Sequence, residues 1–589
     1  MKTQILGKNQ GSTKKKADYD VIYNRFLVIF GFLAIGSFLL AFFYIPLSKI
    51  MRYAFVKDQT FSFSEFSDIF TSSLNLSAIS FSIFQALLSS LICFLLGFPI
   101  SFFMAKYTFP GKKLLLNIMT VPFVLPSIVV LLGFIVVYGE NGWINTLWNI
   151  ITENDFPLIK LFGSFQGILL AHVFYNISVV IRMLIPAWEN IDYEQIEIAR
   201  SLGANRFACF FKIILPQIFN YILSSILLIF TYCFNSFAIV LYLGEARFQT
   251  IEVRVFRLMT SSFDFSGGAS LALLQLLINS LVIILYLFFE KKTRQMARGK
   301  NISFPKIAIQ FSRKHWKNNL FLALFIIHVI LVALFSILPI LAVIIASFIP
   351  FKSGISIFWG YGQLFSFSPN SLLGTSPMRL ILNTFWFASL TMIATLFFSL
   401  MIVFLLRNRY QKINNFQVSR ADSLISFLII IPMATSSITL AIGLFLQFQT
   451  SILFAGSVWI IIILAHVLIS IPFTTRSILA SYNRIDLDLL NIAATLGSSR
   501  IQIFRKIELP LIKNGLIVGA IFSFAISLGE FGATNFLARS EYGTLSIGIS
   551  KLLFSRTLQL PASMATILII ITVLCFFFIH TIGDIDFKV

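Results

Sequence analysis

The stretch EIARSLGANRFACFFKIILP, from Glu197 to Pro216, has a second copy, NIAATLGSSRIQIFRKIELP, from Asn491 to Pro510. In each copy a glycine, Gly203 or Gly497, is followed ten residues later by the start of an Ile-x-Leu-Pro run. Equivalent positions are 294 residues apart, and the same spacing relates more distant matches such as Thr250 and Thr544. The chain is therefore predicted to contain one structural unit twice.

The composition places this repeat in a membrane. Hydrophobic residues make up 58% of the chain, charged residues 12%, and the mean hydropathy is +0.89. Apolar runs of about twenty residues recur, long enough to cross a hydrocarbon core of ~30 Å as helices. We predict an all-α polytopic protein with twelve spans in two parallel six-helix repeats. The predicted spans are 26–46, 82–105, 114–138, 166–186, 217–243, 269–289, 319–348, 380–406, 423–446, 456–479, 511–535 and 562–583.

Four segments follow from these spans. They are a cytoplasmic N-terminal segment (1–25), a first half (26–289), a basic cytoplasmic linker (290–318) and a second half (319–589). The even number of spans before the linker gives both halves the same orientation. Parallel repeats predict a pseudo-two-fold axis along the membrane normal, with a path between the halves.

The charge distribution orients the chain. Its formal net charge is +21, and the basic residues cluster between apolar runs, for example at 14–16, 291–300 and 407–412. Loops on the opposite side, such as residues 140–164, carry few of them. This positive-inside pattern predicts a cytoplasmic N-terminus, linker and repeated motif, and it argues against nucleic acid as a partner.

The repeated motif is typical of a short surface helix that a partner covers. Ile198, Ala199 and Leu202 form a narrow apolar face. Gly203 permits a turn out of helical geometry, and Pro216 is suited to the first turn of the next membrane helix. A plain surface helix between two spans is the alternative for one copy. The second copy, with identical internal spacing, favours a docking function.

The pattern EIA-x3-G-x9-I-x-LP resembles the EAA loop of ABC importer permeases of the binding-protein-dependent, type I kind. In that family the loop docks into a groove of the ATPase subunit. The resemblance implies an ATPase-docking loop formed by Glu197, Ile198, Ala199, Gly203, Ile213, Leu215 and Pro216, and by Asn491, Ile492, Ala493, Gly497, Ile507, Leu509 and Pro510. Both copies depart from the family pattern. Ile198 and Ile492 replace the first alanine, and Asn491 replaces the glutamate that Glu197 retains.

The fusion of two halves is similar to the thiamine and iron(III) permease group. LPSIVVLLGFIVVYGENGW (125–143), QGILLAHVFYN (166–176) and FNSFAIVLYLG (234–244) resemble the thiamine permeases, whereas LGEFGATNFLARSEYGTL (528–545) resembles both branches. The resemblance implies a multi-pass permease of a bacterial inner membrane. Its partners would be two copies of an ATPase subunit, a periplasmic or lipid-anchored binding protein, and membrane lipid. The ATPase subunits would use the ATP.

Thiamine is the favoured substrate, and iron(III) is the main alternative. Molybdate, sulfate or polyamine uptake, an ion-coupled secondary transporter and a channel also stay open. Glycine-rich phosphate loops, zinc-binding His-Glu-x-x-His and nucleophile elbows are missing from the sequence. The chain is therefore predicted not to be an enzyme and to bind no cofactor or metal of its own.

A few ionisable residues fall within apolar runs. Glu530 is the one carboxylate placed within a span, near the outer end of the eleventh, where a charge costs ~2.5–3.5 kcal/mol at mid-membrane. It is a candidate for lining the path of a cationic substrate, and a hydrogen bond to a neighbouring helix or a position at the membrane interface is the alternative. His172 and His466 are predicted to form interhelical hydrogen bonds, and Arg182 and Arg476 to extend towards the membrane surface.

Overall fold

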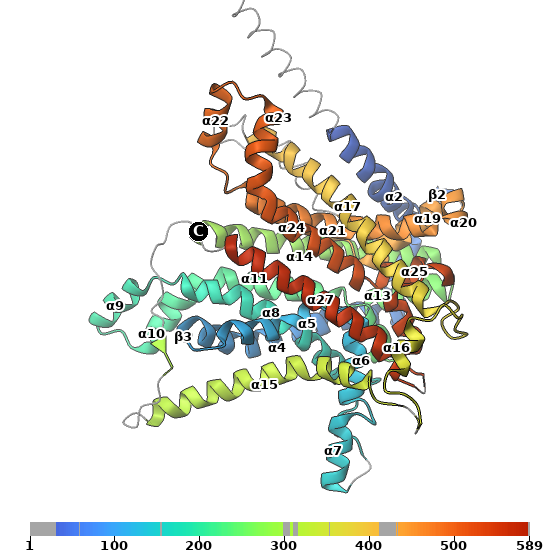
Figure 1. The fold of residues 1–589 in the computed structure, drawn as a ribbon, viewed down its shortest axis with the longest axis horizontal. Coiled ribbons are helices and arrows are strands. Elements are labelled where there is room, and N and C mark those ends of the chain that lie inside the picture. The colour runs from blue at the N-terminus through green and yellow to red at the C-terminus, as the bar shows by residue number, and fades with distance from the viewer. Residues whose placement is uncertain are drawn as a thin grey trace, which may run out of the picture.

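The computed structural model describes residues 31–57, 59–153, 156–297, 307–309, 316–350, 352, 354–410, 432, 434–555 and 557–586. Within these ranges the chain is almost entirely helical (Figure 1), which confirms the predicted all-α class. The predicted N-terminal segment, the first part of the ninth predicted span (423–446) and much of the linker lie outside the described residues. The predicted segment boundaries stay predictions.

The helices that precede the linker are α2 (Ile45–Phe55), α3 (Ser64–Asp68), α4 (Ser73–Lys106), α5 (Lys112–Val124), α6 (Ser127–Tyr138), α7 (Trp143–Thr152), α8 (Phe165–Glu189), α9 (Tyr193–Ser201), α10 (Arg206–Cys209), α11 (Leu215–Phe234), α12 (Ala238–Leu243), α13 (Ile251–Thr260) and α14 (Phe265–Ala297). The later ones are α15 (Trp316–Ala346), α16 (Trp359–Leu364), α17 (Pro377–Tyr410), α19 (Ser437–Phe448), α20 (Ile452–Gly456), α21 (Val458–Tyr482), α22 (Leu487–Thr495), α23 (Arg500–Ile503), α24 (Leu509–Gly529), α25 (Gly532–Leu537), α26 (Leu545–Leu552) and α27 (Gln559–Asp586). π-Helical turns lie at η1 (Leu40–Tyr44), η2 (Phe210–Ile214) and η3 (Phe504–Glu508), and a 3-10 turn at η4 (Ser540–Tyr542).

Two small sheets complete the list of elements. Strands β1 (Val56–Lys57) and β2 (Thr60–Phe61) form an antiparallel pair after α2. Strand β3 (Tyr107–Thr108), which follows α4, pairs in parallel with β4 (Ile307–Ala308) from the linker. The described part of the linker therefore lies beside the loop after the second predicted span.

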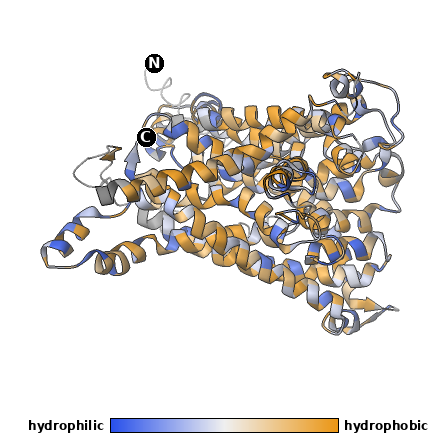
Figure 2. Cartoon of the chain, turned by 90° about the horizontal axis from the view of Figure 1, so that it is seen from below, coloured by the Kyte–Doolittle hydropathy of each residue, from blue (hydrophilic) through white to orange (hydrophobic). Residues whose placement is uncertain are grey.

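Eleven helical segments in the described ranges are long and apolar enough to cross a membrane. Figure 2 shows their apolar residues along the long helices and hydrophilic residues gathered in the loops and helix ends. Segment α19, the described part of the ninth predicted span, is apolar but shorter. The polytopic character is confirmed, while a count of twelve spans depends on residues that the structure does not describe.

Three predicted spans are broken rather than continuous. The predicted span 114–138 is interrupted at Leu125 and Pro126, between α5 and α6. The predicted spans 217–243 and 511–535 end early, at Phe234 and Gly529, and each resumes as a short helix, α12 or α25. The sequence predicted that Glu530 lies within a span, whereas the structure places it outside the long helices. It lies in the break between α24 and α25, where a side chain can reach free backbone N–H groups.

The first helix of each half crosses onto the other half. The α2 segment packs against α19, and α15 packs against α5 and α6, although each also contacts the last helix of its own half, α14 or α27. Helical residues just before α2 also contact α17, where the ring centroids of Phe38 and Phe398 lie 3.9 Å apart. Helix α15 also contacts α4, where His328 Nε2 lies 3.0 Å from the carbonyl oxygen of Leu96. Each half is thus contacted by the first helix of the other half.

Both exchanged helices use the same Gly–Pro contact. Gly133 of α6 faces Pro339 of α15, and Gly443, the seventh residue of α19 as Gly133 is of α6, faces Pro46 of α2. A Cβ atom at Gly133 would lie 2.5 Å from the carbonyl oxygen of Pro339. A Cβ atom at Gly443 would lie 3.2 Å from Cβ of Pro46. Small residues at such crossings let helix backbones approach closely in a membrane.

Replacing Gly133 by leucine is expected to weaken the docking of α15. The added side chain would meet backbone atoms of Pro339, and overpacking of this kind typically costs about 1–3 kcal/mol. Thermal unfolding in detergent should give a lower midpoint for Gly133→Leu than for the unaltered chain. Gly36→Leu is the matched control because a Cβ atom at Gly36 meets nothing within 4 Å. Equal midpoints for the two variants would contradict this packing account.

Candidate functional site

The two copies of the repeated motif fold alike. Asp192 caps α9 by accepting the backbone N–H of Gln195, and Asp486 caps α22 by accepting that of Asp488. Both helices end at the predicted glycine, Gly203 or Gly497, with φ of 88° and 81°. At both ends the residue after the glycine donates its N–H to a carbonyl five residues back, as in a Schellman motif. The glycines are required there by backbone conformation, because other L-residues rarely adopt positive φ.

The apolar face of each motif helix is uncovered. Leu202 and Leu496 are 82% and 80% exposed, and Ile198 and Ile492 are 59% and 56% exposed. Glu197 and Asn491 are exposed, whereas Ala199 is partly buried and Ala493 is buried. Matching apolar residues that stay exposed in both copies are typical of a surface that a protein partner covers.

The end of each motif continues into a membrane helix through a π-helical turn. In η2 and η3 the helix takes an extra residue per turn immediately before Leu215-Pro216 and Leu509-Pro510. Ile213 and Ile507 lie within these turns and are partly buried, and both prolines occupy the first turn of the following α-helix. The fifth span of each half therefore begins at α10 or α23, before the proline that the sequence suggested as its start. A short turn therefore joins each motif helix, α9 or α22, to the start of a membrane helix.

A cavity of about 400 Å³ lies between the halves. Residues from α5, α6, α8, α11 and α12 line one side, and residues from α19, α21, α24 and α25 line the other. Its aromatic lining consists of Phe123, Tyr175, Tyr232, Phe237 and Phe531. The polar lining includes His172, Asn176, Asn235, Ser236, Ser437 and Glu530. The sequence prediction that Glu530 faces a cavity agrees with this position, although its function in a path stays a prediction.

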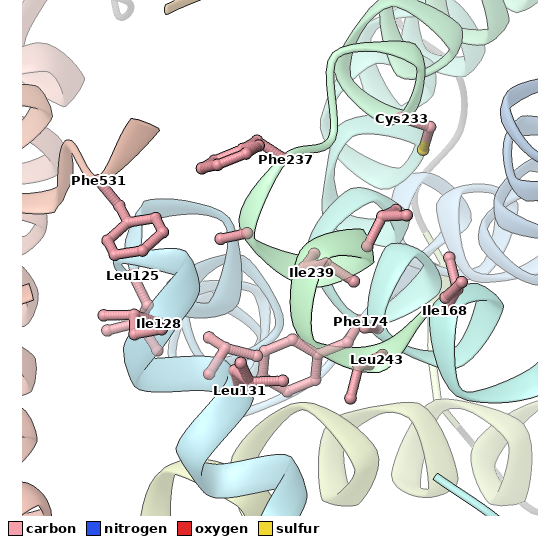
Figure 3. Close-up of a cluster of buried hydrophobic side chains, with 14 of the residues drawn as sticks. Leu125, Ile128, Leu131, Ile168, Phe174, Cys233, Phe237, Ile239, Leu243 and Phe531 are labelled. Atoms are coloured by element: carbon pink, nitrogen blue, oxygen red, sulfur yellow. The ribbon is translucent and has the colours of Figure 1, made fainter. Parts of the chain in front are cut away.

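Two equivalent phenylalanines line this cavity where the fifth spans end, away from the repeated motifs. Phe237 and Phe531, 294 residues apart, are buried and stack with ring centroids 6.0 Å apart (Figure 3). Each follows the end of a fifth span, α11 or α24, which starts at a docking loop. Contact between equivalent residues places them on the pseudo-two-fold axis. The motif helices α9 and α22 lie well apart (Figure 1).

Histidines hold the two breaks in equivalent ways. His172 Nδ1 lies 3.1 Å from Ser89 Oγ, and its Nε2 lies 2.9 Å from Ser236 Oγ. His466 Nδ1 lies 2.7 Å from Ser527 Oγ, and its Nε2 lies 2.8 Å from Thr534 Oγ1. Both side chains are buried, which agrees with the predicted interhelical hydrogen bonding. Within the described residues, no group of three or more metal-ligating side chains is found.

The two breaks differ in charge. Glu530 occupies the position equivalent to Ser236. Its carboxylate accepts the backbone N–H groups of Ala533 and Thr534 and the Thr534 hydroxyl at 2.7–2.9 Å, and Oε2 lies 3.3 Å from His466 Nε2. In the first half, the equivalent position carries the neutral hydroxyl of Ser236. Among its lining residues, the cavity therefore carries a carboxylate only on the side of the second half.

A second buried carboxylate lies at the interface. Glu252 of α13 is 1% exposed, and its hydrogen-bonding groups include Ser436 and the backbone of Ile438 at the start of α19. Burial raises its pKa to about 8, and the nearby charge of Glu530 contributes. A carboxyl of this kind is protonated in the folded chain at neutral pH and ionised in the unfolded chain.

The contact between Glu252 and α19 is therefore expected to weaken with rising pH. A folded-state pKa above the unfolded value stabilises the fold fully below about pH 4.5, and this contribution is lost as the pH rises to about 8. The melting midpoint of the full chain in detergent should fall between pH 6 and pH 8.5. Glu252→Gln should reduce this slope, because its amide cannot ionise. An unchanged slope would show that Glu252 does not titrate in this range.

The predicted extension of Arg182 and Arg476 towards the membrane surface stays a prediction, and the structure adds a feature that the sequence did not indicate. Both line a second cavity between the halves, of about 600 Å³, which shares Phe123 with the first cavity. Arg182 Nε donates to Thr120 Oγ1 at 3.0 Å. The guanidinium groups are therefore directed between the halves, which a linear reading of span ends could not reveal.

Sequence reasoning also missed the phenylalanine pair and the importance of Ser236. The 294-residue spacing was a usable signal for both, since it makes Phe237 equivalent to Phe531 and Ser236 equivalent to Glu530. Glu252 carried no such signal, because Ser546 occupies its equivalent position.

The chain was compared with known proteins. Residues 97–295 and 413–586, more than half of the chain, match the family described as binding-protein-dependent transport system inner membrane component. The thiamine transport system permease protein of Haemophilus influenzae is 29% identical over 86% of this chain and 89% of its own length. The corresponding Escherichia coli protein is 26% identical over 85% of this chain and 87% of its length.

A solved structure also aligns with part of the chain. It is a bacterial ABC transporter involved in the import of the acidic polysaccharide alginate. The match has 18% identity and a TM-score of 0.38, and covers 47% of this chain and 98% of the other.

Proposed function

This chain belongs to the family of binding-protein-dependent transport system inner membrane components, and from this premise we propose that it is the permease subunit of an ATP-driven thiamine importer. Two thiamine transport permeases align with 85–86% of its length, including both halves. The observation that best supports the assignment to an ATP-driven importer is the pair of docking helices with matching exposed apolar faces.

The lining of the first cavity suits an organic cation. Thiamine carries a positively charged thiazolium ring joined to an aromatic pyrimidine. The Glu530 carboxylate would attract the positive charge, and faces of Phe123, Tyr175 or Tyr232 would provide cation–π and stacking contacts. A volume of about 400 Å³ falls within the range of small-molecule sites.

Energy would come from a separate ATPase. Two ATPase subunits would bind the faces formed by Ile198 and Leu202 and by Ile492 and Leu496 on the cytoplasmic side, where the N-terminus would also lie. Closure of the ATPase pair would move α9 and α22 together. Because each is joined to a fifth span, this motion would separate Phe237 from Phe531 and open the cavity to a binding protein on the outer face.

The arrangement described above fits one stage of this cycle. The halves meet at the phenylalanine pair, while the docking helices are apart and the second cavity extends towards them. This is the geometry of an inward-facing state, from which substrate leaves to the cytoplasm.

Transport by the reconstituted complex tests the proposal. Proteoliposomes that contain the chain, its ATPase and its binding protein should accumulate radiolabelled thiamine when ATP is supplied on the ATPase side. Excess unlabelled thiamine should compete, whereas iron(III) citrate and sulfate should not. Competition by iron(III) citrate with no effect of thiamine would overturn the substrate assignment in favour of the iron(III) alternative.

A further inference from the structure

The second cavity between the halves differs chemically from the first. It has a volume of about 600 Å³ and is lined by three arginines, Arg182 of α8, Arg476 of α21, and Arg484 just beyond α21. Neither aspartate nor glutamate is among its described lining residues, and the hydroxyls of Thr120, Ser178, Ser477 and Ser481 complete its polar groups. A thiamine-like cation would be repelled here, so the first cavity's ligand does not explain this one.

Arg182 is held in place on one side of the cavity. Its Nε donates to Thr120 Oγ1 at 3.0 Å, and its Nη2 donates to Asn117 Oδ1 at 3.3 Å. Its guanidinium also lies 5.8 Å from the ring centre of Phe576 in α27. A guanidinium fixed by such contacts loses little conformational entropy when it binds a ligand.

Arg476 occupies the equivalent position on the other side. Within the described residues it makes no hydrogen bond or ion pair, and it is only partly exposed. A partly buried guanidinium of this kind favours an anionic ligand, because its charge has lost part of its hydration. Equivalent arginines from the two halves that line one cavity suit a group with several acceptor oxygens, such as a phosphate.

The remaining lining is apolar. Phe473, Phe522, Phe576, Leu228 and Ile579 surround the space between the arginines. An inorganic anion alone would leave this surface uncovered, whereas an anion with an aromatic or aliphatic body would fill it.

We infer that this cavity is a binding site for an organic phosphate that enters from the cytoplasm. The phosphate would be held by Arg182, Arg476 and Arg484, and the organic body by the surrounding phenylalanines. The inference rests on the proposed function only in placing the cavity on the cytoplasmic side of the path. A bound molecule would keep the two halves apart and so slow the return to the outward-facing state. The headgroup of an anionic lipid shares this chemistry and is separated by the experiment.

Isothermal titration calorimetry on the full chain in phosphatidylcholine nanodiscs provides the test. The probe is 1-naphthyl phosphate, and 1-naphthol, which lacks the phosphate, is the comparison. The phosphate ester should bind and 1-naphthol should bind much more weakly. Arg476→Gln should weaken binding of the ester about tenfold or more, since hydrogen bonds to charged groups are worth about that much. Lys291→Gln, which removes an exposed basic residue outside the cavity, should leave binding unchanged.

Each other outcome has a defined meaning. Equal binding by the unaltered chain and Arg476→Gln would overturn the site. Arg476→Lys, which keeps the charge but not the planar fork, should bind at an intermediate level and replaces the glutamine variant if that variant does not fold. The last outcome concerns lipid. Phosphatidylglycerol in the nanodiscs could abolish binding of the ester, and the purified chain could retain phosphatidylglycerol only when Arg476 is present. Both results together would show that the occupant is a lipid headgroup and would overturn the soluble ligand. The titration contains neither a transport substrate nor the ATPase. A failure of 1-naphthyl phosphate to bind is therefore distinguishable from a failure of the proposed transport function.

Discussion

Replacing both Gly203 and Gly497 by leucine is expected to abolish ATP-driven uptake while the chain still folds and inserts. Both glycines have positive φ, where another L-residue costs about 1–2 kcal/mol. Both costs disappear if the loops leave the conformation that docks. Two such costs would therefore lower the affinity of the chain for its ATPase subunits about thirtyfold or more. Uptake into proteoliposomes and ATP hydrolysis by the same sample are the measurements. Hydrolysis should no longer depend on binding protein or substrate.

Local space separates docking from folding in this experiment. A Cβ atom at Gly203 or Gly497 meets nothing within 4 Å, so leucine causes no clash within the chain itself. Gly111, with φ of 82° and an equally open surrounding, is the matched control outside the motif. Gly111→Leu should retain coupled uptake. The docking account would be contradicted if the double variant transported as well as Gly111→Leu.

Glu530→Gln is expected to reduce thiamine uptake about tenfold to a hundredfold without loss of protein from the membrane. The glutamine keeps the size of the side chain but removes the charge that would face the cation, and hydrogen bonds to charged groups are worth about 1.5–3 kcal/mol. The measurement is the initial rate of ATP-driven uptake at limiting thiamine. Glu140→Gln, at an exposed carboxylate that does not line the cavity, is the control.

The repeat provides a stricter test of the same residue. Ser236 and Glu530 are equivalent, and each lies beside an equivalent histidine. Ser236→Glu combined with Glu530→Ser moves the carboxylate across the pseudo-two-fold axis within the same cavity. Uptake by this double variant should exceed that of Glu530→Ser alone. If Glu530 serves only to cap α25, the exchange should give no recovery.

The long-range repeat made much of this architecture predictable. It indicated the two halves, the short helices of the repeated motif and their terminal glycines, because each of these depends on local sequence and on equivalence between copies. The breaks at Pro126, Asn235 and Glu530 were missed, since apolar residues continue on both sides of them and a hydropathy pattern does not register a change of helix direction.

Contacts between the halves could not be predicted from either copy alone. The exchange of α2 and α15, the stacking of Phe237 on Phe531 and the cavity lined by both Arg182 and Arg476 all depend on how one copy is placed against the other. Gly133 and Pro339 illustrate this point. Each is unremarkable in its own span, and their significance lies in a contact between residues more than 200 positions apart.

The most direct test of the central claim is thiamine uptake by the purified chain in proteoliposomes with and without its ATPase subunit. The account predicts no accumulation by the chain alone, with or without an imposed ion gradient, and accumulation when the ATPase, ATP and binding protein are added together. Accumulation by the chain alone, driven by an ion gradient, would contradict it.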